Sequence, residues 1–212
     1  KRVEDSGLEI VGLHSLLFGV KECGLFVDSV HFRNTVNHFK RLISVCADLG
    51  GRTLIFGGGR RRGDVEYLSA YATTISFLSE ILPDLERNGL VLCFEPLGRK
   101  DTDFINTVEE SLRLIRDVDS TGVGLQIDVK ALIENNEFDQ LDVSGLSQYL
   151  THVHVNTPSL GIIGEADAFY KEHKSIAAIL QKIHYDGFVT LEQTQINPMD
   201  VMGPIEQSLN FV

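Results

Sequence analysis

Four side chains that can bind a metal ion each stand at the end of a short apolar run in this sequence. They are Glu95, Asp128, His154 and Glu192, and the interval between neighbours is long enough for one strand and one helix. Three carboxylates and one imidazole suit a hard or borderline divalent ion such as Mn²⁺, Mg²⁺, Co²⁺ or Zn²⁺. Without a cation, three carboxylates packed together would repel one another, and some would take up protons. We therefore expect one divalent metal ion as the cofactor.

A metal ion beside carboxylates supports proton transfer next to a carbonyl group. The ion polarises the carbonyl of a hydroxy-ketone and stabilises an enediolate, while a carboxylate within reach removes the α-proton as a general base. Gln126 and His152 lie two residues before Asp128 and His154. Because side chains two positions apart on a strand point the same way, we expect Gln126 and His152 to lie beneath the metal ligands and to orient them.

Three further side chains are candidates for binding a substrate. His14 ends the first apolar run, so we expect it at the same strand ends as the metal ligands. Arg60 and Arg62 lie in the glycine-rich loop 57–63, where the backbone can approach a ligand closely. Because the arginine fork suits a phosphate or a carboxylate, we expect Arg60 and Arg62 to contact such a group on the substrate.

Alternating strands and helices must carry these residues. Apolar positions three and four residues apart predict helices, and short continuous apolar runs predict strands that are covered on both faces. We expect Asp64 to cap the second helix and Thr107 with Glu110 to form a capping box. The predicted strands are 8–13, 53–56, 90–94, 123–127, 151–155 and 188–191, and the predicted helices are 28–49, a long helix from 64, 107–118, 173–184 and 203–212.

This order of elements is typical either of an open, doubly wound sheet or of a (β/α) barrel. The four candidate metal ligands favour the barrel. In an open sheet, four successive strand ends would spread along a line, whereas in a barrel they converge on one mouth. We therefore predict an α/β barrel, with residues 1–212 as a single domain.

Composition excludes several classes of protein. The chain has 212 residues, of which 43% are hydrophobic and 23% are charged, as in ordinary globular domains. The net charge of −11 argues against a nucleic-acid partner, because such proteins need a basic face. No apolar run approaches the ~18 residues of a membrane span. Three cysteines without a CxxC pair indicate a reducing, cytoplasmic location. We expect no membrane partner. Whether the chain forms a homo-oligomer is left open by the sequence.

Several stretches together match a known family in their order and spacing. The sequence resembles the sugar phosphate isomerase/epimerase group of the xylose isomerase-like barrel superfamily, which includes ketose 3-epimerases and hydroxypyruvate isomerases. The matching stretches are LCFEPL at 92–97, DFINT at 103–107, GLQID at 124–128, HVHV at 152–155 and YDGFVTLE at 185–192, with weaker matches at 12–17 and 54–57.

The resemblance implies a (β/α)8 TIM barrel that binds one divalent metal ion through Glu95, Asp128, His154 and Glu192. It implies that Glu95 and Glu192 also transfer protons as an acid/base pair. The implied substrate is a small sugar or sugar phosphate. The leading hypothesis is therefore a metal-dependent isomerase or epimerase that acts on a small hydroxy-ketone through an enediolate.

The sequence departs from the family pattern at three points. Six strands are predicted where eight are expected, so we expect the barrel to lack its first one or two βα units and to be incomplete at its N-terminus. Ala131 and Leu160 stand where epimerases commonly have a histidine and an arginine that contact substrate. Lys130, next to Ala131, is the candidate to replace a lost contact.

Other functions stay open at this point. A lyase would use the same metal and base as an isomerase. A degenerate barrel without activity could serve as a binding module, as the changed substrate positions suggest. An endonuclease IV-like phosphodiesterase shares the barrel, but it would need several metal ions and additional histidine and glutamate ligands that the sequence does not display at its strand ends.

Overall fold

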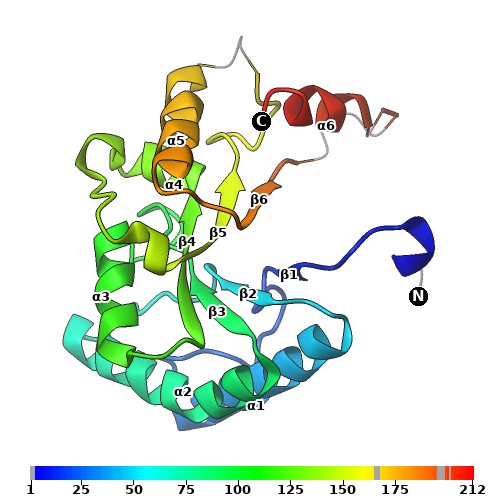
Figure 1. Ribbon diagram of the computed structural model, residues 1–212. Helices are drawn as coiled ribbons and strands as arrows, with labels where there is room; N and C mark the ends of the chain where they lie inside the picture. The colour runs from blue at the N-terminus through cyan, green and yellow to red at the C-terminus, as the bar shows by residue number, and fades with distance from the viewer. Residues whose placement is uncertain (1–2, 165–167, 195–198, 201) are drawn as a thin grey trace.

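Six parallel strands form one curled sheet in the computed structural model of the protein. The structure describes residues 3–164, 168–194, 199–200 and 202–212. The strands follow the order β1-β2-β3-β4-β5-β6, so every strand pairs with its neighbour in the sequence. The helices follow one another around the outside of the curl (Figure 1). This arrangement confirms the predicted (β/α) barrel architecture, with six of the eight strands of a TIM barrel.

Most elements lie close to their predicted positions, but only the last two residues of the predicted strand 8–13 form a strand. The strands are β1 (Gly12–Leu13), β2 (Thr53–Phe56), β3 (Val91–Phe94), β4 (Val123–Asp128), β5 (Leu150–Val155) and β6 (Phe188–Leu191). The α-helices are α1 (Ser29–Asp48), α2 (Tyr67–Asn88), α3 (Val108–Val118), α4 (Val129–Glu134), α5 (Tyr170–Lys182) and α6 (Met202–Leu209), and short 3₁₀ turns cover Glu4–Ser6, Phe138–Gln140 and Leu146–Gln148. No helix in the described part of the chain has both the length and the apolar character that crossing a membrane requires.

The start of helix α2 differs from the prediction. Glu66, not Asp64, caps the helix, and its side chain accepts a hydrogen bond from the backbone N–H of Ser69. Gly63 adopts the left-handed conformation, with φ of 57°, and the chain then makes one more turn before the helix begins. The predicted capping box of α3 is confirmed: Thr107 and Glu110 each accept a hydrogen bond from the other's backbone N–H.

Aromatic side chains hold helices α1 and α2 on the outer face of the sheet. The ring of Phe39 lies 5.0 Å from that of Phe56 and 4.9 Å from that of Phe77, and all three are buried. Phe94 continues the cluster, with its ring 5.5 Å from that of Phe56. Because side chains alternate along a strand, an outward-facing Phe94 places the next residue, Glu95, toward the inside of the curl.

Arg60 has a structural role, so the expectation that it contacts substrate is wrong. Its side chain is fully buried and donates hydrogen bonds to the carbonyl oxygens of Gly57 (2.7 Å), Phe104 (2.7 Å) and Glu95 (2.5 Å). Burial lowers the pKa of Arg60 to about 10, so the side chain still carries its charge at neutral pH. A fully buried arginine whose Nε, Nη1 and Nη2 atoms all bind carbonyls cannot reach a ligand in solution.

Arg62 also binds the backbone. Its Nη1 atom donates to the carbonyl oxygen of Val65 (2.7 Å), and its Nε atom donates to that of Asp103 (3.2 Å). The Asp103 carboxylate in turn accepts the backbone N–H groups of Arg62 (2.8 Å) and Gly63 (3.1 Å). Arg62 therefore joins the loop before α2 to the loop before α3, and its contact with a substrate phosphate stays a prediction.

Replacing Arg60 with methionine should strongly destabilise the fold. Arg60→Met leaves the buried carbonyls of Gly57 and Glu95 without the arginine donor, while that of Phe104 keeps a long hydrogen bond from Thr102 (3.5 Å). Because each unpaired carbonyl costs about 1–3 kcal/mol, we expect the free energy of unfolding to fall by more than about 2 kcal/mol. The exposed neighbour provides the control, because Arg61→Met should change that free energy by no more than about 0.5 kcal/mol. Urea unfolding followed by circular dichroism measures both, and equal effects would contradict the structural role of Arg60.

Candidate active site

A cavity of about 470 Å³ lies at the carboxyl ends of the strands. One part of its wall is charged and is built from His14, Glu95, Asp128, Glu192, Asp101 and Lys130. Another part is apolar and includes Leu17, Phe18, Leu97 and Leu160. Arg60 and Arg62 are absent from the described wall, in keeping with their structural roles. The cavity is therefore where the predicted acidic residues, and not the predicted arginines, meet.

Strand register brings the four predicted metal ligands together. Asp128 on β4 lies directly opposite His154 on β5. Glu95 follows β3, and Glu192 follows β6, where its backbone N–H donates to the carbonyl oxygen of Val155 (3.1 Å). All four residues thus stand at the same edge of adjacent parallel strands, as the spacing in the sequence predicted.

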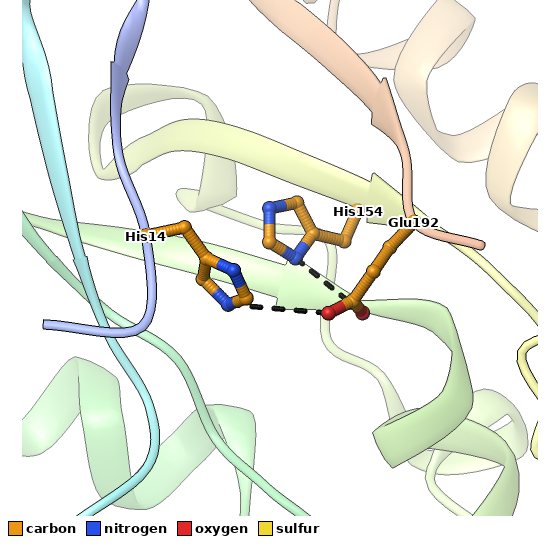
Figure 2. A group of neighbouring side chains, drawn as sticks. All are labelled: His14, His154 and Glu192. Atoms are coloured by element: carbon orange, nitrogen blue, oxygen red, sulfur yellow. Dashed lines mark ion pairs between the residues drawn. The ribbon is translucent and has the colours of Figure 1, made fainter. Parts of the chain in front are cut away.

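The three carboxylates face one nitrogen atom of His154. The Nδ1 atom lies 3.3 Å from Glu95 Oε1, 3.8 Å from Asp128 Oδ2 and 3.9 Å from Glu192 Oε2. Figure 2 shows His154 and Glu192 with His14 beside them. Glu95, Asp128 and His154 are buried, whereas the side chain of Glu192 is 31% exposed. Three carboxylate oxygens thus surround one imidazole nitrogen in a largely buried environment.

Glu95, Asp128 and His154 fit a divalent metal ion, because one possible ligand atom of each lies within 4.8 Å of the others. Glu192 forms a second such group with His14 and the same His154. The Nδ1 atom of His154 is buried and has no hydrogen-bond partner, although buried polar atoms are nearly always paired. Ligand atoms around an ion with bonds of about 2.1 Å lie about 3.0–3.5 Å apart, and the distance from His154 Nδ1 to Glu95 (3.3 Å) falls in this range, whereas those to Asp128 (3.8 Å) and Glu192 (3.9 Å) are longer. Burial, and then the charge of Glu95, raise the pKa of Asp128 to about 7.

Gln126 and His152 lie beneath the four residues, where the sequence placed them. Gln126 is fully buried, and its Nε2 atom donates to Glu95 Oε1 (2.8 Å). His152 shares a hydrogen bond of 2.9 Å with the hydroxyl of Thr190, through its Nε2 atom. Burial, followed by the charge of His154, lowers the pKa of His152 to about 4, so its ring is neutral at neutral pH.

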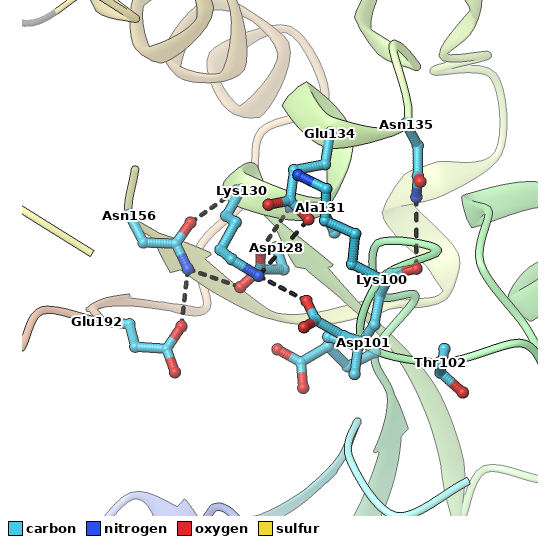
Figure 3. Close-up of polar contacts among 12 residues, drawn as sticks. Lys100, Asp101, Thr102, Asp128, Lys130, Ala131, Glu134, Asn135, Asn156 and Glu192 are labelled. Carbon is cyan, nitrogen blue, oxygen red and sulfur yellow. Dashed lines mark hydrogen bonds and ion pairs between the residues drawn. The ribbon is translucent and has the colours of Figure 1, made fainter. Parts of the chain in front are cut away.

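Asn156 belongs to this cluster, and sequence reasoning missed it. Its Nδ2 atom donates to Asp128 Oδ2 and to Glu192 Oε2, at 2.7 Å in both cases (Figure 3). The sequence did contain a signal, because Asn156 lies two residues after His154 and side chains two positions apart share a face. The prediction considered only the residues two positions before each ligand.

Asp128 also caps the helix that follows it. Its Oδ1 atom accepts a hydrogen bond from the backbone N–H of Ala131 (2.8 Å), at the start of α4. Its Oδ2 atom faces His154 and Asn156. One carboxylate therefore divides its two oxygens between a helix end and the acidic cluster.

His14 and Lys130 both line the cavity. The side chain of His14 is 42% exposed, and its Nε2 atom lies 4.0 Å from Glu95 Oε2 and 4.0 Å from Glu192 Oε1. Lys130 Nζ lies 2.6 Å from Asp101 Oδ2 and 3.6 Å from Glu134 Oε2 (Figure 3). Burial opposes the charged form of Lys130, but the two acidic partners outweigh it and raise the pKa of Lys130. The lysine is therefore charged and already paired.

The two glutamates are arranged alike. Each has one oxygen that accepts a hydrogen bond from an amide and faces His154, namely Oε1 of Glu95 and Oε2 of Glu192. Each has a second oxygen that faces His14. A carboxylate held in this way can present one oxygen to a cation and the other to a proton of a bound molecule.

Solved structures of several proteins are similar to this chain. A 3-keto-D-glucoside 4-epimerase from E. coli has a TM-score of 0.79 and 19% identity, over 98% of this chain and 80% of that one. D-psicose 3-epimerase, crystallised in the presence of D-fructose, has a TM-score of 0.80 and 21% identity, over 98% of this chain and 77% of that one. The IolI protein with a bound zinc atom has a TM-score of 0.73 and 14% identity, over 96% of this chain and 74% of that one.

At these identities the structural likeness establishes the shared fold. No curated protein sequence matches the chain. The model of one protein family does match, over residues 1–212, and six parallel strands with helices outside them have the architecture of that family. The chain belongs to the xylose isomerase-like TIM barrel family.

Proposed function

We propose that this protein is a divalent-metal-dependent isomerase or epimerase that acts on a small hydroxy-ketone sugar. The observation that carries the proposal is the convergence of three carboxylates on the buried Nδ1 atom of His154. The names of the similar structures support the reaction class, because they include sugar epimerases. The cavity beside the cluster has room for a small sugar.

Glu95, Asp128, His154 and Glu192 would hold the metal ion. Carboxylate and imidazole ligands suit Mn²⁺, Mg²⁺, Co²⁺ or Zn²⁺. When bound, the ion would polarise the substrate carbonyl and stabilise the negative charge that develops on its oxygen. Gln126 would keep Glu95 in place through its hydrogen bond, and His152 would support His154 through the edge-to-face contact of their rings.

Glu95 and Glu192 would carry out the proton transfer. Oε2 of Glu95 and Oε1 of Glu192 come from strands β3 and β6 and lie at equal distances, 4.0 Å, from His14 Nε2. One oxygen would remove the proton next to the carbonyl, which leaves an enediolate. The other would return a proton on the opposite face in an epimerase, or to the neighbouring carbon in an isomerase. His14 is placed to donate a hydrogen bond to a substrate oxygen between them.

The cavity favours an uncharged sugar over a sugar phosphate. Of the described residues that line it, only Lys130 carries a permanent positive charge, and Asp101 already pairs with that charge. A phosphate needs arginine or lysine donors that are free to bind it. Lys130 and Asp101 together would instead bind hydroxyl groups of the substrate, one as donor and one as acceptor.

Replacing Glu192 with glutamine should stop proton transfer. We expect the wild-type protein, loaded with Mn²⁺ in D₂O, to place deuterium on the carbon next to the carbonyl of D-fructose or D-psicose. Because a general base contributes about 10²–10⁴-fold, Glu192→Gln should slow this exchange at least about 100-fold. NMR measures the exchange and identifies the product. Glu206→Gln, at an exposed position of α6, is the control and should exchange like the wild type. Unchanged exchange in Glu192→Gln would remove Glu192 from the mechanism.

Metal binding should depend on Asp128 and not on a carboxylate elsewhere in the cavity. We expect calorimetric titration with Mn²⁺ to give about one ion per chain, and Asp128→Asn to weaken binding more than about 100-fold, beyond the usual effect of a residue outside the ligand set. Asp101→Asn removes a carboxylate that lines the same cavity but pairs with Lys130. That variant should bind Mn²⁺ like the wild type. Equal losses in both variants would show diffuse attraction by acidic residues instead of a defined site.

A further inference from the structure

We infer that Asn156 is a positioning residue that fixes the carboxylates of Asp128 and Glu192 for metal binding and proton transfer. The inference rests on the proposed function. Asn156 is fully buried at the end of β5, in the middle of the acidic cluster. It touches two of the four candidate ligands directly, and it follows a third, His154, by two residues in the chain.

Backbone groups determine which way the Asn156 amide points. The backbone N–H of Lys130 can only donate, and it binds the side-chain oxygen of Asn156 at 2.7 Å. The NH₂ group must therefore face the opposite side, toward the carboxylates (Figure 3). The main chain is held as well, because the carbonyl oxygen of Asn156 accepts a hydrogen bond from His173 Nε2 on α5 at 2.9 Å. The amide thus has one orientation, and both of its hydrogens are used.

The Asn156 amide selects one oxygen of each carboxylate. It binds Asp128 Oδ2 and Glu192 Oε2, which are the oxygens that face His154 Nδ1. Glu192 depends on this contact, because it is partly exposed and no other hydrogen bond from a described residue reaches its carboxylate. With Oε2 held, Oε1 of Glu192 stays directed toward the cavity and His14.

The opposite side of the cluster shows the same arrangement. Gln126 donates to Oε1 of Glu95, the oxygen that faces His154, and leaves Oε2 directed toward His14. An amide is suited to this position, since it donates to carboxylates without adding charge. An acidic side chain would increase the repulsion, and a lysine would compete with the metal ion as a counter-charge. At both glutamates the amide binds the carboxylate oxygen that faces His154 and leaves the other oxygen directed toward His14. This recurrence indicates positioning, because packing alone would not select the oxygen that faces His154 in both residues.

The test is a comparison of two buried asparagines. Asn156→Leu keeps the size of the side chain but removes both donors, so we expect the dissociation constant for Mn²⁺ to rise about 10–100-fold, as for other residues that orient metal ligands. We also expect kcat for a ketose to fall at saturating Mn²⁺ with little change in KM. Asn106→Leu is the matched control, because Asn106 is also buried and donates to the carbonyl oxygens of Leu97 (2.8 Å) and Thr102 (3.0 Å). It should lower stability and leave Mn²⁺ affinity unchanged.

The outcomes separate this inference from the proposed function. Wild-type affinity in Asn156→Leu, or an equal loss of affinity in Asn106→Leu, would overturn the positioning role. Wild-type protein that binds Mn²⁺ but exchanges no ketose proton would refute the proposed function, while the affinity comparison would still decide the role of Asn156. If Asn156→Leu does not fold, Asn156→Ser replaces it. Its hydroxyl can donate to one carboxylate only, so Mn²⁺ affinity should fall in the same direction, and unchanged affinity would overturn the inference.

Discussion

Repulsion among three carboxylates is the constraint on which the centre of this molecule depends. Glu95, Asp128 and Glu192 meet at one imidazole nitrogen in a mostly buried place, where their negative charges are poorly screened. Burial raises the pKa of Asp128, and the charge of Glu95 adds to the shift. Two side-chain amides, one helix N-terminus and the proposed cation each offset part of the repulsion. Burial disfavours a charged His154, but Glu95 and the other two carboxylates outweigh it and raise the pKa of His154. Neutral donors orient the oxygens, and a divalent ion would supply positive charge between them.

The rest of the fold brings these groups together without crowding them with further charge. Parallel pairing places Asp128 opposite His154, and the aromatic cluster on the outer face directs Glu95 inward. Arg60 lies against the ring of Phe94 and donates to the backbone carbonyl of Glu95, so its donors fix the end of β3. The charge of Glu95 in turn favours the charged form of this buried arginine.

The sequence predicted the strand ends well and the partners of individual side chains poorly. Apolar runs and the spacing of one strand–helix unit were enough to place Glu95, Asp128, His154 and Glu192 at one edge of a barrel. The assignment of Arg60 failed because composition does not reveal whether an arginine meets buried carbonyls or solvent. The prediction that Asp64 caps α2 was wrong because the left-handed turn at Gly63 depends on a contact with Asp103, which is far away in the sequence. Asn156 was missed because its role depends on hydrogen bonds between neighbouring strand ends.

The two oxygens of Asp128 link the acidic cluster to a helix. Oδ1 caps α4 through the N–H of Ala131, and Oδ2 faces the cluster. Anything that holds the carboxylate more firmly must also oppose fraying of the first turn of α4, and anything that protonates or displaces it must loosen that turn. The hydrogen exchange rate of the Ala131 amide is therefore an internal reporter of the state of the site, readable without any substrate.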